Sequence, residues 1–158
     1  MNILLKNNLI AVFTYMGISI LAFVLHMFYL DTPFIFSRDM ELSWLVIQAL
    51  ILGIHTFVSL GLCFWVGRKL LKSTGNIFLN GLSVVAVVIF IIVALYLSSI
   101  VRSGYFFLLV APINPISLTI VGFTDIKQIY IWFAMSPLPF IAMWMGIMSK
   151  KYNKRKKV

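Results

Sequence analysis

Three polar side chains that could accept a proton or form hydrogen bonds fall within one strongly apolar stretch, Ser43–Val66. Gln48, His55 and Ser59 are separated by seven and then four residues. Such spacings place residues on one face of a helix. Polar groups are costly inside a bilayer, so they mark candidate functional positions. The row predicts either a ligand-binding or proton-accepting site, or hydrogen bonds that join two helices as part of their packing.

A second candidate lies where prolines and an asparagine interrupt the apolar segment Tyr105–Thr124. Pro112 and Pro115 each lack an N–H and disfavour helix in the preceding residue, and Asn114 favours a turn between them. These residues argue against a continuous membrane-spanning helix, although a full crossing remains an alternative. We expect a segment that lies at the outer interface, or a re-entrant segment whose irregular backbone is buried in protein or faces water.

A third candidate is the proline pair in the last apolar stretch, Gln128–Ser149. Pro137 leaves the Phe133 carbonyl, and Pro139 the Met135 carbonyl, without the usual donor four residues later. Ser136, neighbouring helices or water could satisfy these carbonyls instead. One interpretation is a broken helix that lines a cavity facing the Pro112–Pro115 turn. The other is a tolerated kink. Under the first interpretation Asn114, Pro115, Ser136 and Pro137 join His55, Gln48 and Ser59 as ligand-binding candidates.

A polar cluster is expected outside the apolar stretches on the outer face. Its members are Asp39, Glu41, Arg102 and Asp125. These side chains could bind a cation or form ion pairs, although a solvated loop needs no further role. A lipid-modifying enzyme would require them to converge at the membrane interface.

Signatures of other chemistry are missing from the sequence. The histidines, His26 and His55, are expected to differ in depth by about 12 Å at 1.5 Å per residue. Two histidines and the distant Cys63 are not a typical set of ligands for zinc. The sequence contains no G-x-S-x-G elbow, no Walker loop and no G-x-G-x-x-G motif. We therefore expect no metal, no cofactor and no catalytic residue, and we expect that the protein is not an enzyme.

Composition indicates that lipid surrounds most of the chain. Of its 158 residues, 62% are hydrophobic and 11% are charged, whereas soluble domains carry about 25% charged residues. About 20 apolar residues suffice to cross the hydrocarbon core. We therefore predict an all-α, polytopic membrane helix bundle of four transmembrane helices, with the Tyr105–Thr124 segment between the third and the fourth. The expected spans are Asn8–Leu30, Ser43–Val66, Asn80–Val101 and Gln128–Ser149.

The basic residues orient these four spans. Lys and Arg concentrate on the cytoplasmic side of membrane proteins. Four crossings with a cytoplasmic N-terminus leave three basic residues outside, Arg38, Arg102 and Lys127, and the other ten inside. A fifth crossing would move the basic tail, residues 150–158, to the outside. We therefore expect residues 1–149 to form one membrane domain and the tail to be cytoplasmic, in contact with anionic lipid.

The sequence limits the function to a few classes of membrane protein but does not identify one activity. The bias toward Lys, Ile and Asn is typical of a low-GC bacterial plasma-membrane protein. The favoured hypothesis is a non-enzymatic accessory or immunity-type subunit that contacts another membrane protein within the bilayer. The alternatives are a small transporter or channel component with a cavity near the proline breaks, and then a lipid-modifying enzyme. The net charge of +9 is explained by membrane orientation, so no nucleic-acid partner is expected.

Overall fold

The structure is a computed structural model that describes residues 2–30, 42–101, 112 and 127–155. Every regular element within those ranges is an α-helix, which confirms the predicted all-α class. In the part of the chain that the structure describes, four helical stretches are long and apolar enough to cross a membrane, which indicates a multi-pass membrane protein. The helices are α1 (Ile3–Leu30), α2 (Leu42–Lys69), α3 (Ile77–Leu82), α4 (Val85–Val101), α7 (Gln128–Met135) and α8 (Pro137–Arg155).

The helices agree with the four expected spans but differ in continuity. The first two spans extend further than expected, as α1 and α2. The third is divided between α3 and α4 by a turn at Ser83–Val84, and the fourth is divided between α7 and α8 at Ser136. The expected interfacial or re-entrant segment, Tyr105–Thr124, lies outside the described residues except for Pro112, which is buried.

The core consists of one buried row from each long helix. On α2 the row recurs every three or four residues, as expected for a helix packed along one side. Tyr15 of α1 meets Phe90 of α4 edge to face, with ring centroids 6.4 Å apart. The fully buried aliphatic side chains at the centre include Val87, Ile91, Met143 and Ile147. Many other large apolar side chains are exposed, as lipid-facing residues must be.

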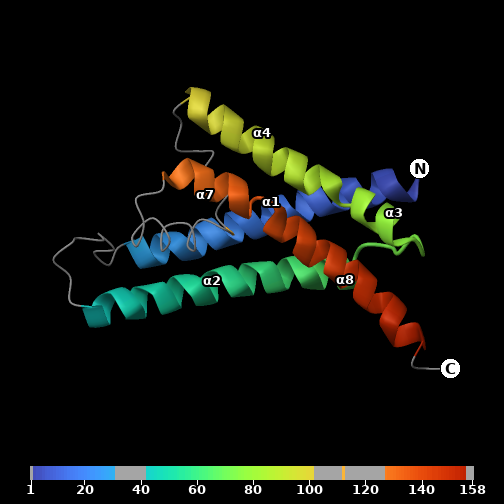
Figure 1. Ribbon diagram of the computed structural model, residues 1–158, viewed down its shortest axis with the longest axis horizontal. Helices are drawn as coiled ribbons and strands as arrows, with labels where there is room; N and C mark the ends of the chain where they lie inside the picture. Colours follow the sequence, from blue (N-terminus) through green and yellow to red (C-terminus); the bar gives the residue numbers. More distant parts are fainter. Residues whose placement is uncertain (1, 31–41, 102–111, 113–126, 156–158) are drawn as a thin grey trace.

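The most extensive helix pair is α2 with α8, which cross near the C-terminal end of α2 (Figure 1). Glycines lie on both sides of the crossing. A Cβ atom at Gly67 would collide with the Met143 backbone, and one at Gly146 would lie 2.8 Å from the Arg68 backbone nitrogen. Small residues allow such close approach in membranes, where packing rather than the hydrophobic effect drives helix association.

Several helix ends that carry basic residues lie together at one end of the bundle. There α1 begins, α2 ends, α3 begins and α8 ends (Figure 1). The cationic residues there whose side chains the structure describes are Lys6, Arg68, Lys69, Lys72 and Lys150, and we call this region the basic end. Lys150 donates a hydrogen bond to the Leu71 carbonyl just beyond α2. A cation at this position also interacts favourably with the negative end of the α2 dipole.

Buried asparagines hold the loop between α2 and α3. The Asn7 amide donates to the Lys72 carbonyl at 2.7 Å, and its oxygen accepts from the Lys72 N–H at 3.1 Å. Asn80 accepts hydrogen bonds from the backbone N–H and the hydroxyl of Thr74. Gly75 takes the left-handed conformation, with φ of 82°, which glycine adopts without strain. The loop is therefore fastened to both α1 and α3.

The division between α3 and α4 is bridged by another α1 side chain. The Asn8 amide donates to the Leu82 carbonyl at 2.9 Å, and its oxygen accepts from the Ala86 N–H at 3.0 Å. The Ser83 hydroxyl donates to the Asn80 carbonyl within the turn. Backbone groups that the turn would leave unpaired thus gain partners, which is required for irregular backbone near lipid.

Candidate functional site

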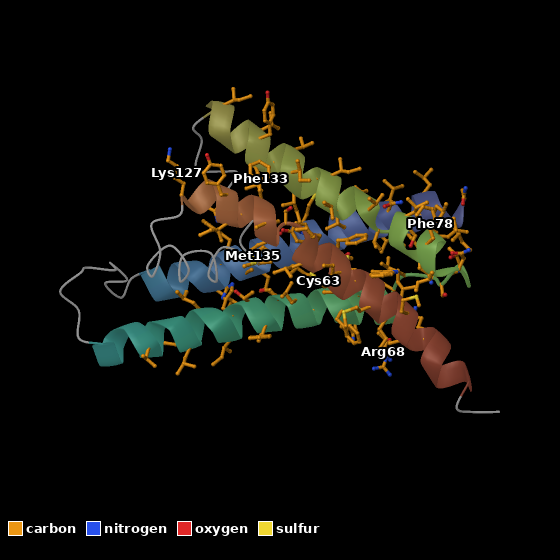
Figure 2. All side chains as sticks on the ribbon, in the orientation of Figure 1. Cys63, Arg68, Phe78, Lys127, Phe133 and Met135 are labelled. Carbon is orange, nitrogen blue, oxygen red and sulfur yellow. The ribbon has the colours of Figure 1, made fainter. Side chains whose placement is uncertain are left out.

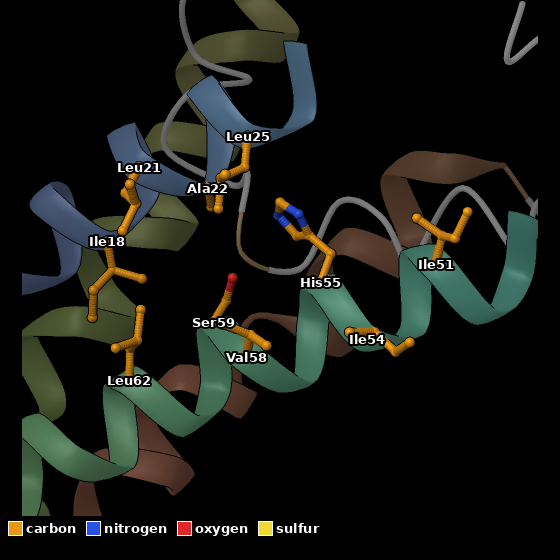
Figure 3. Close-up of a pocket in the computed structure, with 10 residues that line it drawn as sticks. All are labelled: Ile18, Leu21, Ala22, Leu25, Ile51, Ile54, His55, Val58, Ser59 and Leu62. Atoms are coloured by element: carbon orange, nitrogen blue, oxygen red, sulfur yellow. The ribbon is translucent and has the colours of Figure 1, made fainter. Parts of the chain in front are cut away.

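The strongest candidate site is a groove between α1 and α2 with a volume of about 300 Å³ (Figure 3). Because the groove is formed by one side of each helix, its lining residues repeat at helical spacing. From α1 they are Ile18, Leu21, Ala22 and Leu25, and from α2 they are Ile51, Ile54, His55, Val58, Ser59 and Leu62.

His55 and Ser59 supply the polar side chains of this groove, which we call the α1–α2 groove. Their side chains project from α2 toward α1, and the imidazole of His55 reaches toward Ala22 and Leu25 (Figure 3). Only 7% of His55 and 4% of Ser59 is exposed. The structure therefore brings together two members of the predicted Gln48–His55–Ser59 row. The Gln48 side chain is outside what the structure describes.

The rim of the α1–α2 groove is apolar and exposed. Leu21 is 50% exposed on α1, and Ile54 and Val58 are 62% and 53% exposed on α2. The groove thus opens on the surface that meets lipid, while its floor offers an imidazole and a hydroxyl.

The predicted break in the last span is present, and Ser136, one of the expected partners for the freed Phe133 carbonyl, binds it. The Ser136 hydroxyl donates to the Phe133 carbonyl at 2.8 Å, which compensates for the donor that Pro137 lacks. Ser136 is 2% exposed and Pro139 is also buried. Neither Ser136 nor Pro137 lines the α1–α2 groove or the second groove described below.

The remaining predicted site residues fall in parts of the chain that the structure does not describe. They are Asp39, Glu41, Arg102, Asn114, Pro115 and Asp125, and the side chain of His26 joins them. Within the described ranges, no group of three His, Cys, Asp or Glu side chains could hold a metal ion. The predicted outer-face cluster and the predicted contact between the two proline breaks stay predictions.

Sequence reasoning missed the asparagines at the basic end. Asn7 and Asn80 are each 1% exposed, and Asn8 bridges the turn between α3 and α4. A usable signal was present, because an asparagine at the end of an apolar helix is well placed to bind backbone groups of a neighbouring loop. These residues build the loop but line neither described groove.

Comparison of the chain with protein-family models, with curated proteins and with solved structures found no match in any of the three.

Proposed function

We propose that this protein is a non-enzymatic subunit of a membrane assembly, which binds a transmembrane helix of a partner protein along the α1–α2 groove. The observation that carries the proposal is the placement of His55 and Ser59. Two polar side chains lie at the floor of an otherwise apolar groove that opens toward lipid. A partner helix with a polar or small residue at this depth would pack into the groove and exchange hydrogen bonds with them.

The physical basis is the nature of helix association in a bilayer. Apolar exposure alone drives no association there, because lipid chains are as apolar as leucine. Shape and polar contacts supply the specificity instead. Bonds of this kind contribute about 0.6 kcal/mol on average and up to about 1.7 kcal/mol in membrane proteins. Two polar contacts together with groove packing are therefore enough to select one partner over bulk lipid.

The proposal extends to orientation and location. The protein lies in the plasma membrane of a bacterium with both termini cytoplasmic, so the basic end faces the cytoplasm. The tail after α8 then contacts anionic lipid of the inner leaflet. The support for this orientation is the concentration of lysine and arginine at the basic end of the described bundle.

The other hypotheses have weaker support from the described residues. For a transporter, the break at Ser136 would have to expose polar backbone to a cavity, but Ser136 is buried and satisfies the Phe133 carbonyl itself. The residues on which a lipid-modifying enzyme would depend are outside the described ranges, so that hypothesis stays a prediction. The partner-helix proposal rests on a described groove with polar groups in it.

Affinity purification from native membranes tests the proposal when matched α2 variants are compared. His55→Leu and Ser59→Leu remove the polar groups and fill the α1–α2 groove. Thr56→Val is the matched control, because Thr56 is equally buried, at 2% exposure, but does not line the groove. Its hydroxyl bonds within α2, to the Leu52 carbonyl.

We expect a membrane protein to co-purify in a fixed ratio with the wild type and with Thr56→Val. That protein should be reduced at least about threefold with His55→Leu and with Ser59→Leu, since loss of about 0.6–1.7 kcal/mol corresponds to about 3- to 18-fold in affinity. Equal recovery of the same protein with all four chains would contradict the proposal. So would purification of the wild type with no stoichiometric membrane protein.

A further inference from the structure

A second groove lies between α3 and α8, at the basic end. It has a volume of about 280 Å³. All its lining residues are apolar or aromatic, and they include Ile77, Phe78 and Leu82 on α3 and Phe140 and Trp144 on α8. Phe78 projects at the surface and is 69% exposed (Figure 2). We call this surface the α3–α8 groove.

The walls of the α3–α8 groove are fixed by specific contacts. The rings of Phe140 and Trp144 are stacked, with centroids 6.3 Å apart and planes 18° from parallel. The Trp144 indole N–H donates to the Ile77 carbonyl at 3.2 Å. This bond ties α8 to the first residue of α3 and orients the indole. The groove is therefore a built feature rather than a gap between loosely placed side chains.

Glycine keeps the floor of the groove open. A Cβ atom at Gly81 would lie 3.9 Å from the Trp144 indole nitrogen and 4.0 Å from the Phe140 ring. These are ordinary contact distances, so alanine fits at this position without strain. A larger side chain would occupy the groove itself.

The depth of the groove places it next to the lipid head groups. Ile77 is the first residue of one membrane-crossing stretch, and Lys150 is the last residue of another. Trp144 lies about 9 Å along α8 from Lys150 at 1.5 Å per residue. The α3–α8 groove therefore lies beside the part of an acyl chain nearest the head group, and aromatic residues favour this depth.

The charge around this end is entirely positive in the described part of the chain. Lys6, Lys69, Lys72, Arg68 and Lys150 gather there, and the described ranges contain no aspartate or glutamate. Arg68 projects away from the end of α2 (Figure 2). Basic residues near a membrane surface attract anionic lipid by about 1 kcal/mol each. The electrostatics thus select the head group, while the groove accepts the chain.

We propose that the α3–α8 groove binds an anionic phospholipid, with one acyl chain along Phe140 and Trp144 and the phosphate head group held by the cations of the basic end. The occupant is identified by charge complementarity beside an all-apolar groove at head-group depth. This site is separate from the α1–α2 groove. It rests on the basic end meeting the head groups, and it requires no partner protein.

A photoreactive lipid tests this proposal on the purified full-length chain. The protein is reconstituted in phosphatidylcholine vesicles that contain a trace of phosphatidylglycerol with a diazirine in one acyl chain. A phosphatidylcholine with the same diazirine is the comparison probe. After irradiation, mass spectrometry locates the labelled residues, and excess unlabelled phosphatidylglycerol or phosphatidylcholine serves as competitor.

We expect the anionic probe to label the region of Ile77–Val85 or Phe140–Trp144 at least fivefold more than the neutral probe. Unlabelled phosphatidylglycerol should compete, and phosphatidylcholine should not. Gly81→Leu should remove most of this labelling. Gly17→Leu is the matched control, because a Cβ at Gly17 meets nothing within 4 Å. A Lys69→Gln, Lys72→Gln double variant should reduce the preference for the anionic probe.

Several results would overturn the proposal. Equal labelling of the wild type by both probes would do so, and this comparison does not depend on the folding of any variant. Labelling spread evenly over lipid-facing residues such as Phe13 and Phe57 would show an ordinary lipid surface. Undiminished labelling of Gly81→Leu would exclude the groove as the binding place. Each of these results leaves the partner-helix proposal untouched, since no other protein is present.

Discussion

Replacement of the glycines at the crossing of α2 and α8 is the sharpest test of the packing described here. In Gly67→Ala the new methyl group would overlap the Met143 carbonyl and lie 2.9 Å from the Met143 Cα. Carbon atoms pack at about 3.5–4.0 Å. The helices must therefore separate locally by about 0.6 Å or more. The obstacle is backbone, so a side-chain rotation cannot relieve it.

We expect Gly67→Ala to lower the free energy of unfolding by about 2–3 kcal/mol, near the upper part of the usual range for overpacking. Gly146→Ala should act similarly, because its Cβ would lie 3.0 Å from the Gly67 Cα and closer still to the Phe64 carbonyl. The two changes strain one contact. The double variant should therefore lose clearly less than the sum of the single losses.

Unfolding by sodium dodecyl sulfate in mixed micelles, followed by tryptophan fluorescence and circular dichroism, measures these differences. Gly53→Ala is the matched control on the same helix, because a Cβ at Gly53 meets nothing within 4 Å. It should be neutral or slightly stabilising, since alanine favours helix over glycine. If Gly67→Ala and Gly146→Ala unfold at the same detergent fraction as Gly53→Ala, the close crossing is refuted.

Three further predictions follow from the described contacts and the proposed orientation. Asn7→Ala should destabilise the loop at Lys72 by about 1–3 kcal/mol, because it leaves a buried donor and acceptor without partners; hydrogen exchange of this loop should accelerate about tenfold or more, and unchanged exchange would contradict the clamp. Ser136→Ala should lower the free energy of unfolding by only about 0.6 kcal/mol, the average for membrane side-chain hydrogen bonds; a loss above 2 kcal/mol would mean that the hydroxyl has a larger role than the Phe133 contact. In a Cys63→Ala, Val158→Cys chain, an impermeant maleimide should label intact cells only after permeabilisation, and labelling before it would refute a cytoplasmic C-terminus.

The sequence was sufficient to predict the fold class, because hydrophobic length determines membrane crossing almost independently of tertiary contacts. It was also sufficient for the break at Ser136, since proline removes a backbone donor wherever it stands in a helix. The turn at Ser83–Val84 was not predictable in this way. It contains neither proline nor glycine, and it depends on Asn8, a residue 74 positions away from the Leu82 carbonyl that it binds.

The candidate site was likewise predictable only in part. The shared face of His55 and Ser59 followed from their spacing on α2. Their position in a groove did not, because it depends on which side of α1 lies opposite. Sequence periodicity describes each helix alone, whereas a groove is a property of two helices.

The binding role of the α1–α2 groove is tested most directly by photo-crosslinking from its rim in native membranes. A benzoylphenylalanine at position 58 replaces a rim residue that is 53% exposed. At position 57 it replaces Phe57, which is 74% exposed and lies outside the groove. We predict that position 58 gives one discrete adduct with a membrane protein, which Ser59→Leu abolishes, and that position 57 gives lipid adducts only. If both positions react only with lipid, the groove is ordinary membrane-facing surface and the proposed function is wrong.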